Sequence, residues 1–302
     1  MIQIPETFAK STIAREGDEG RAWLASLPHL VDEILERWSC EPTGPVTHGQ
    51  VGMIIPVQSV QSVDRAPAVL KVSFPHPGNV HEPDALEVWG GRGAVRLHKR
   101  DDTSFALLLE RAGDGTLADL DDIDEAMAVV GGLSRRLAVQ APPGLPRLGD
   151  RTEEWEDDLR KGAERLPRSL PPRVVQAAIA TVCELGRDHP DTLVHGDLHL
   201  GNVLRAEREP WLAIDPKGYV GDPSYDAITV VRSRWDALSG TLDLKAALLR
   251  RLTIFADAAE LDRERVRRWT QARAVMEAYW GRDHGDPAWL IQASDQIAES
   301  LT

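Results

Sequence analysis

The stretch LVHGDLHLGNVL, residues 193–204, holds two histidines, an aspartate and an asparagine between apolar flanks. Asp197 precedes Asn202 by five residues, and His195 and His199 stand two residues to either side of the aspartate. These residue types suit a metal site, a nucleophile site or a phosphate-transfer loop. Each site requires different partners elsewhere in the chain, so the rest of the sequence decides which it is and which fold carries it.

Metal and nucleophile sites both lack their partners. On a strand, His195, Asp197 and His199 would share one face, as in a binuclear metallophosphatase. Such a site also needs an earlier Asp-x-His and a later Gly-Asn-His, and the sequence has neither. The HExxH pattern, the G-x-S-x-G elbow and the Walker A loop are absent as well. A transition-metal site is therefore not expected.

The phosphate-transfer interpretation finds its partners downstream. The spacing of Asp197 and Asn202 matches the H-x-D-x-x-x-x-N loop of protein-kinase-like enzymes. In such a loop Asp197 can face the attacking hydroxyl while Asn202 turns its amide oxygen toward a metal. Thirteen residues after Asn202, the apolar run WLAID ends in Asp215, a hard oxygen ligand of the kind that Mg²⁺ prefers.

Further partners stand upstream, in kinase order. Lys71 interrupts the apolar run AVLKV, and a lysine in such a run needs a partner. Glu82, eleven residues later, begins a predicted helix and can pair with it. Before both, Gly49 and Gly52 lie in THGQVG, where glycines let the backbone approach phosphates. Each of these residues alone is common in proteins, and it is their joint occurrence in this order that indicates a kinase site.

The hydrophobic pattern predicts an α+β chain whose two parts differ in character. Residues 19–38 read as a helix that Pro28 breaks or restarts, and residues 41–110 as a strand-rich block with one inserted helix closed by glycines. Beyond residue 113 the pattern is helical, apart from short apolar runs at TLVHG and WLAID. We predict a helical segment at 1–40, an N-lobe at 41–111 and a C-lobe at 112–302.

Composition excludes several classes of partner. The formal net charge of −13 disfavours nucleic acid and anionic membranes. No apolar run approaches a membrane span, and the first residues lack a signal-peptide pattern, so we expect a cytoplasmic protein. The two cysteines are far apart and predict free thiols. Monomer and homodimer both stay open.

Several stretches together resemble a known family. The stretch at 193–204, followed by AIDPKGYVGDPSYD, is similar to the aminoglycoside phosphotransferases and related small-molecule kinases. AVLKV, EPDALEVWGGRGAVRL and LLLERAGDGTL resemble the streptomycin 6-phosphotransferase and hydroxyurea phosphotransferase branch. The resemblance covers roughly residues 40–300. It implies a protein-kinase-like fold with a small β-rich nucleotide-binding N-lobe and a large helical C-lobe that carries the catalytic loop and the acceptor pocket.

The resemblance also implies roles and cofactors. Asp197 would be the catalytic base or orient the hydroxyl, and Asn202 and Asp215 would hold Mg²⁺ on the phosphates of ATP or GTP. Lys71, held by Glu82, would contact the α- and β-phosphates, while the backbone from Glu110 to Ala112 would bind adenine. The two histidines of the loop would pack beneath it, and Asp226 would start a helix and anchor the loop. Only Gly49 and Gly52 are present of a full G-x-G-x-x-G, so the phosphate contacts of that loop depend on these two.

The acceptor is the open question. The resemblance implies direct phosphoryl transfer to a hydroxyl of a cationic small molecule, first of all an aminoglycoside of the streptomycin type, as in antibiotic resistance. Glu277, Trp280 and Asp283 recur at intervals of three on a predicted helix and could hold a cationic sugar, or Trp280 could be core and the acids solvated. A metabolic kinase for a small alcohol or amino sugar and a non-catalytic kinase-fold binding protein are the alternatives.

Overall fold

The chain divides into two compact units in the computed structural model, which describes residues 2–60 and 67–302. The N-terminal unit is Met1–Gly113 and the C-terminal unit is Asp114–Thr302. The stretch QSVDRA at 61–66, which the sequence predicts to be a loop between two strands, lies outside the described residues. Among the described residues, no helix combines the length and the apolar character needed to cross a membrane.

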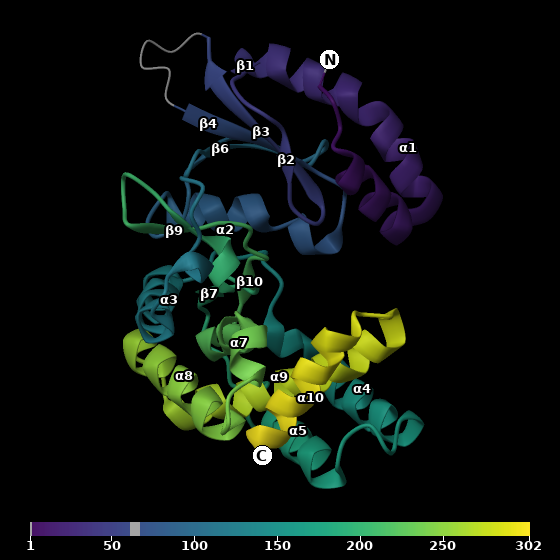
Figure 1. Ribbon diagram of the computed structural model, residues 1–302, viewed down its shortest axis with the longest axis vertical. Coiled ribbons are helices and arrows are strands. Elements are labelled where there is room, and N and C mark those ends of the chain that lie inside the picture. The colour runs from purple at the N-terminus through teal and green to yellow at the C-terminus, as the bar shows by residue number, and fades with distance from the viewer. Residues whose placement is uncertain (1, 61–66) are drawn as a thin grey trace. The chain divides into compact units, whose positions relative to one another are not determined.

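An antiparallel sheet forms the frame of the N-terminal unit (Figure 1). Its strands follow the order β1-β3-β4-β6-β5, and β2 pairs with β3. They are β1 (Cys40–Pro42), β2 (Thr47–His48), β3 (Gly52–Ser59), β4 (Pro67–Ser73), β5 (Leu97–Asp101) and β6 (Ala106–Glu110). The four longer strands confirm the sequence pattern. β1 and β2 fall at or within EPTGPVTHGQVG, residues 41–52, a turn-rich stretch that reads as a loop, because two or three residues are too few to show an alternating pattern.

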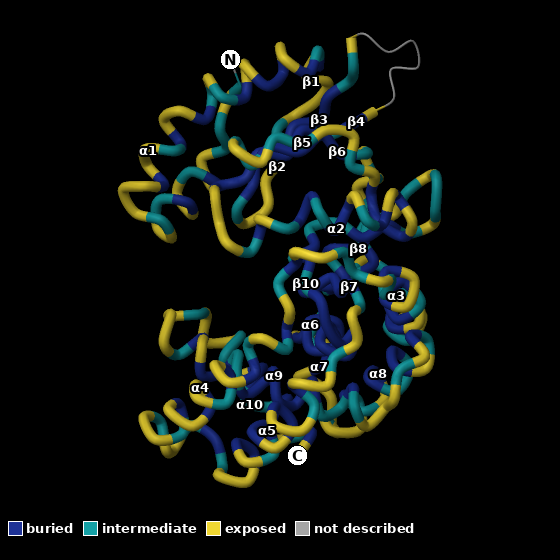
Figure 2. The backbone as a smooth tube through the Cα atoms, turned by 180° about the vertical axis from the view of Figure 1, so that it is seen from behind, coloured by how far each residue is buried: buried dark blue, intermediate teal, exposed yellow. Residues whose placement is uncertain are grey.

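The first helix, α1 (Glu6–Trp38), packs on one face of this sheet. Phe8, Leu27 and Ile34 of the helix join Ile55 and Leu70 of the sheet in one buried cluster. Figure 2 shows buried and exposed segments alternating along α1, as expected of an amphipathic helix. The helix therefore belongs to the same compact unit as the sheet.

The helix begins thirteen residues earlier than predicted, at Glu6 instead of residue 19. Gly17 has a positive φ of 61° and joins two helical pieces across a kink, so the apolar repeat of the earlier piece is out of phase with that of the later one. Pro28 lies inside the helix and does not break it. Leu27 and Val31 near it are fully buried, so packing holds the helix through this position.

The inserted helix is short and ends as predicted. After η1 (Pro77–Asn79), α2 (Glu82–Trp89) stops at Gly90, which adopts a left-handed conformation (φ 56°) and donates its N–H to the carbonyl of Leu86. Pro83 occupies the first turn, where its missing N–H costs little. This short, capped helix places Glu82 at its first residue.

Helices dominate the C-terminal unit, and α9 lies at its centre. α9 contacts α4, α5, α6, α8 and α10, and much of it is coloured as buried in Figure 2. Its Val266, Trp269 and Val275 are fully buried. The helices are α3 (Ile123–Leu137), α4 (Thr152–Arg165), α5 (Pro172–Leu185), α6 (Ala227–Arg232), α7 (Trp235–Ser239), α8 (Leu244–Ala259), α9 (Arg263–His284) and α10 (Ala288–Ser300). The 3₁₀ turns are η2 (Leu117–Asp119), η3 (Leu148–Arg151), η4 (Leu200–Asn202) and η5 (Pro223–Asp226).

Two small two-stranded sheets support residues 193–204. β7 (Leu193–Val194) pairs with β10 (Tyr219–Val220), and β8 (Val203–Arg205) pairs with β9 (Trp211–Ala213). The loop that holds the stretch therefore leaves one sheet, passes through η4 and enters the other. Both of its ends are fixed by backbone hydrogen bonds.

Candidate active site

The ammonium group of Lys71 is held by the carboxylate of Glu82. Lys71 Nζ lies 2.7 Å from both Oε1 and Oε2 of Glu82, and the two residues are 7% and 2% exposed. The strand register sets Lys71 between Ile54 and Leu107, so the cation emerges from an apolar sheet. A buried charge is costly unless it is paired. The pair suggested by the sequence thus fixes a cation at one place in the N-terminal unit.

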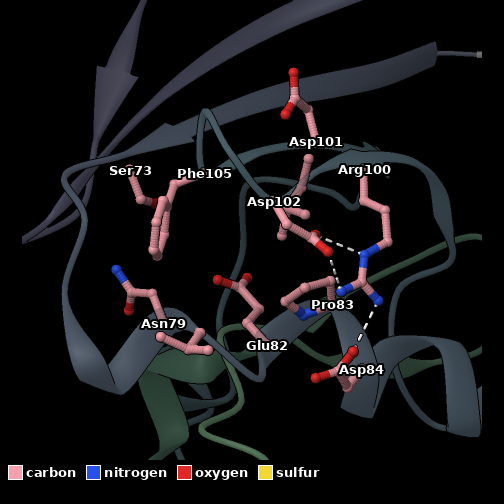
Figure 3. Close-up of a pocket in the computed structure, with 11 residues that line it drawn as sticks. Ser73, Asn79, Glu82, Pro83, Asp84, Arg100, Asp101, Asp102 and Phe105 are labelled. Carbon is pink, nitrogen blue, oxygen red and sulfur yellow. Dashed lines mark hydrogen bonds and ion pairs between the residues drawn. The ribbon is translucent and has the colours of Figure 1, made fainter.

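A cavity of about 190 Å³ lies beside Glu82 in the same unit. Figure 3 shows Glu82 between Asn79 on one side and Arg100 on the other. Arg100 donates hydrogen bonds of 2.7–2.8 Å to Asp102 and to Asp84. Because Asp84 belongs to α2 and Arg100 to β5, this bridge ties the start of the helix to the sheet. It therefore supports the position of Glu82.

The two glycines of the turn between β2 and β3 differ in how strictly they are required. Gly49 donates its N–H to the carbonyl of Gly52 at 2.9 Å, which closes the turn. A Cβ at Gly52 would lie 2.6 Å from Ser73 Oγ and 3.4 Å from Lys71 Cε, whereas one at Gly49 would meet nothing. Only Gly52 is therefore required for close approach, and it brings the turn against the side chain of Lys71.

Glu110 and Ala112 lie where the N-terminal unit ends. Glu110 closes β6, and its backbone N–H binds the carbonyl of Arg96 while its carboxylate accepts the N–H of Arg96 at 3.0 Å. Ala112 follows outside any helix or strand, two residues before the C-terminal unit begins. Both residues thus belong to the segment that connects the units.

The catalytic-loop candidates Asp197 and Asn202 touch directly. Asn202 is buried, and its Nδ2 donates to the backbone carbonyl of Asp197 at 3.0 Å. This bond fixes the amide so that its oxygen turns away from that carbonyl. Gly196, just before Asp197, has φ 84°, and a Cβ there would lie 2.7 Å from the Tyr219 ring. The aspartate therefore follows a turn that only glycine fits.

Asp215 is brought next to this loop by the second small sheet. The N–H of Ile214 donates to the carbonyl of Asn202 at 2.9 Å, so Asp215 follows directly after the contact. Asp215 itself has φ 60°, a conformation that costs a non-glycine residue about 1–2 kcal/mol and that clusters at functional sites. The oxygens of Asn202 and Asp215 form a hard donor set that fits Mg²⁺.

The two histidines of the loop have structural contacts. His195 is buried, and its Nε2 lies 2.9 Å from the carbonyl of Ile214 while its Nδ1 accepts the N–H of Asp197. Burial lowers the pKa of His195 to about 3, so the ring is neutral and Nε2 carries the proton. His199 Nδ1 accepts the N–H of Gly201 and caps η4. Nδ1 of each ring thus accepts a backbone N–H. The part of the chain that the structure describes holds no cluster of three His, Cys, Asp or Glu side chains suited to a metal.

Asp226 anchors the loop from below. Its two carboxylate oxygens accept the N–H groups of Gly196 at 2.8 Å and of His195 at 3.2 Å. Burial raises the pKa of Asp226 to about 7, against the opposing effect of nearby Arg273. Asp226 precedes α6, but its side chain makes no capping bond there. The expected anchor is present, and it binds the loop rather than the helix end.

The three acceptor candidates lie on α9 in different surroundings. Glu277 is ion-paired with Arg232 and, at 2.8 Å, with Arg273. Burial raises the pKa of Glu277, and the two arginines more than reverse the effect, so it is lowered. Trp280 is 59% exposed and stacks on His284, and Asp283 pairs with Arg165. Trp280 is thus not a core residue, while both carboxylates already hold cations.

Comparison with known proteins gives this site a family. A model described as aminoglycoside/hydroxyurea antibiotic resistance kinase matches residues 37–285. The chain belongs to this kinase family. It is 37% identical to a streptomycin 6-kinase of Streptomyces glaucescens over 100% of this chain and 97% of the relative. It is 36% identical to a hydroxyurea phosphotransferase of Kitasatospora aureofaciens over 100% of this chain and 86% of the relative.

Solved structures confirm the fold of this antibiotic resistance kinase. A choline kinase of Streptococcus pneumoniae superposes with a TM-score of 0.58 at 14% identity, covering 90% of this chain and 99% of that one. The α+β, protein-kinase-like fold is therefore confirmed. So is the enzyme class, a nucleotide-dependent phosphotransferase that acts on a small molecule.

One buried arginine close to this kinase's catalytic loop was not predicted from the sequence. Arg273 is buried in α9, donates to the carbonyl of Tyr225 at 2.7 Å and lies over the Tyr225 ring. It links Glu277 to the segment that carries Asp226. One signal was available, because an arginine inside the run ARAVM, four residues before a glutamate, needs a partner as much as Lys71 does.

Proposed function

We propose that this protein transfers the γ-phosphoryl group of ATP to a hydroxyl of a streptomycin-type aminoglycoside, with Mg²⁺, and so inactivates the antibiotic. The observation that carries the proposal is the full-length similarity to a streptomycin 6-kinase, joined to the arrangement of Asp197, Asn202 and Asp215 in one loop system. A cytoplasmic location belongs to the proposal, since both described cysteines are free thiols and the reaction consumes a nucleotide.

The N-terminal unit would bind the nucleotide. The Lys71 ammonium, fixed by Glu82, would contact the α- and β-phosphates, and the turn around Gly52 lies against that lysine. Backbone groups from Glu110 to Ala112 would bind adenine through hydrogen bonds. Because Lys71 is positioned before the nucleotide arrives, little reorganisation is required on binding.

The C-terminal unit would carry out the transfer. Asp197 would accept a hydrogen bond from the acceptor hydroxyl and take its proton as the new P–O bond forms and the bond to the β-phosphate oxygen breaks. Asn202 and Asp215 would hold Mg²⁺, which supplies charge neutralisation on the phosphates when bound. The anchors on Gly196 and His195 keep Asp197 in place, and a hydroxyl needs orientation more than a strong base in a loose transition state.

The acceptor would bind to residues of α9. Trp280 offers an exposed aromatic face, which attracts guanidinium and ammonium groups. Asp283 and Glu277 would contribute negative charge, although each also serves an arginine. We therefore assign the main contact to Trp280 and a smaller part to the two carboxylates.

A product assay tests this proposal. Purified protein is incubated with Mg·ATP and streptomycin, and the product is identified by mass spectrometry and ³¹P NMR. We expect one phosphate per streptomycin, on a single hydroxyl, and none with Asp197→Ala. The control is Asp157→Asn, an exposed acid of α4 with 67% of its side chain accessible, which should behave as wild type. ATP consumption without a phosphorylated product would refute the proposal.

Hydroxyurea is a second candidate acceptor. The full-length relative at 36% identity is a hydroxyurea phosphotransferase. Hydroxyurea is small and uncharged, so an exposed tryptophan beside acids would add little to its binding. Parallel assays with both acceptors decide between them, and a kcat/KM at least tenfold higher for hydroxyurea would replace streptomycin in the proposal.

A further inference from the structure

Lys217 is a lysine of the C-terminal unit, and it lies directly beside the loop that carries Asp197. Its Nζ lies 3.6 Å from Asp215 Oδ2, and its side chain is 20% exposed. This separation exceeds that of a hydrogen bond, 2.7–3.2 Å. The ammonium group is therefore near the carboxylate without being locked to it.

The base of this side chain is held firmly. The N–H of Lys217 donates to the carbonyl of His195 at 2.7 Å. A Cβ at Gly196 would lie 2.9 Å from Lys217 Cβ, so the stem passes directly over the residue before Asp197. The backbone of Lys217 is therefore fixed beside the residue that precedes Asp197, and its ammonium group lies near Asp215.

The negative charge of the groups around Lys217 favours a cation at this position. Asp197 and Asp215 are both carboxylates, and a γ-phosphoryl group brings further negative charge to them. In the loose transition state that charge spreads over the three equatorial oxygens. If Asp215 held a metal, its attraction for Lys217 would weaken, and the ammonium group would turn toward the phosphoryl oxygen.

We propose that Lys217 is a further catalytic residue, whose ammonium group binds an equatorial oxygen of the γ-phosphoryl group during transfer. Lys217 exchanges no proton: the hydroxyl proton goes to Asp197, the new P–O bond forms and the bond to the leaving β-phosphate oxygen breaks. The inference rests on the proposed phosphotransferase function and goes beyond the roles given to Lys71 and Asp197. A lysine that only holds Asp215 in place would behave differently.

Kinetics and a transition-state analogue separate these two roles. The variants are Lys217→Met, Lys217→Gln and Lys217→Arg, and the control is Lys161→Met, a lysine of α4 that is 69% exposed and paired with Asp157. We measure kcat and KM for ATP, and by calorimetry the affinity for ADP with aluminium fluoride. For Met and Gln we expect kcat to fall about 10²–10³-fold, with the KM for ATP changed less than threefold. The affinity for the analogue should fall by the same factor as kcat, and Arg should restore at least a tenth of the activity.

Three results would overturn the inference. They are a kcat within threefold of wild type, an unchanged affinity for the analogue, or a KM for ATP that rises as much as kcat falls. If wild-type protein phosphorylates no aminoglycoside, the proposed acceptor fails instead. The comparison of analogue binding between wild type and Lys217→Gln still decides the role of Lys217, because it needs no acceptor.

Discussion

Glu82→Gln tests the buried ion pair on which the N-terminal unit's part of the site depends. At 2.7 Å and an effective dielectric constant of about 20, the Coulomb attraction between Lys71 and Glu82 is about 6 kcal/mol. The cost of desolvating the Glu82 carboxylate offsets part of this attraction, and that cost is absent for a neutral glutamine. Removing one partner of a buried pair costs about 3–5 kcal/mol. Because the glutamine oxygen still accepts a hydrogen bond from Lys71, we expect the low end, about 3 kcal/mol.

Hydrogen exchange measures this loss of stability in β4 and α2, the elements that carry Lys71 and Glu82. A destabilisation of about 3 kcal/mol corresponds to roughly a 10²-fold loss of protection, which we expect in peptides from β4 and α2. The matched control is Asp157→Asn, which removes the carboxylate of the exposed Lys161–Asp157 pair and should cost at most about 0.5 kcal/mol. Urea unfolding of both variants gives an independent value. If Glu82→Gln costs no more than the control, the buried pair does not hold Lys71, and its assigned role fails.

The remaining predictions concern the C-terminal unit. Asp226→Asn should lower kcat at least tenfold with little change in the KM for ATP, because an amide cannot accept both loop N–H groups; a kcat equal to wild type in steady-state assays would remove its anchoring role. Between about pH 7.5 and 4.5, the free energy of unfolding should fall about 2–3 kcal/mol more in wild type than in His195→Asn. Burial lowers the pKa of His195 in the folded state to about 3, so the neutral ring's contribution to stability is present at neutral pH and lost as the pH falls. Urea unfolding of both proteins at several pH values measures this, and identical pH dependences would contradict the prediction. Trp280→Ala should raise the acceptor KM about 5-fold or more, as loss of a cation–π contact of about 1 kcal/mol predicts, and an unchanged acceptor KM would place the acceptor elsewhere.

Local spacing made the central part of the site predictable from the sequence. In the structure the predicted residues are in contact within each unit. Lys71 binds Glu82, Asn202 binds the carbonyl of Asp197, and Asp215 follows the bond between Ile214 and Asn202. Each of these residues lies at a defined point of a short strand, helix start or turn. A strand ladder or a tight turn converts sequence spacing into geometry with little freedom.

Long-range contacts escaped prediction for a physical reason. The ion pair of Arg232 with Glu277 joins α6 to α9, and helix packing, not sequence spacing, brings those two helices together. Gly17 hid the first part of α1 in the same way, since a single residue of positive φ shifts the helical periodicity. The surroundings of the acceptor candidates were therefore not predictable from the sequence, and in the structure their carboxylates pair with arginines.

The most direct test of the central claim is single-turnover transfer from γ-³²P-ATP to streptomycin by Asp197→Asn, measured beside its affinity for Mg·ATP. Asp197 is held in a glycine turn, with Asn202 on its carbonyl, so the substitution should leave the loop folded and nucleotide binding within about threefold of wild type. Loss of the group that orients the hydroxyl and takes its proton should slow transfer by about 10²–10⁴-fold. Transfer within tenfold of wild type, at equal nucleotide affinity, would show that Asp197 does not orient the acceptor and would contradict the account.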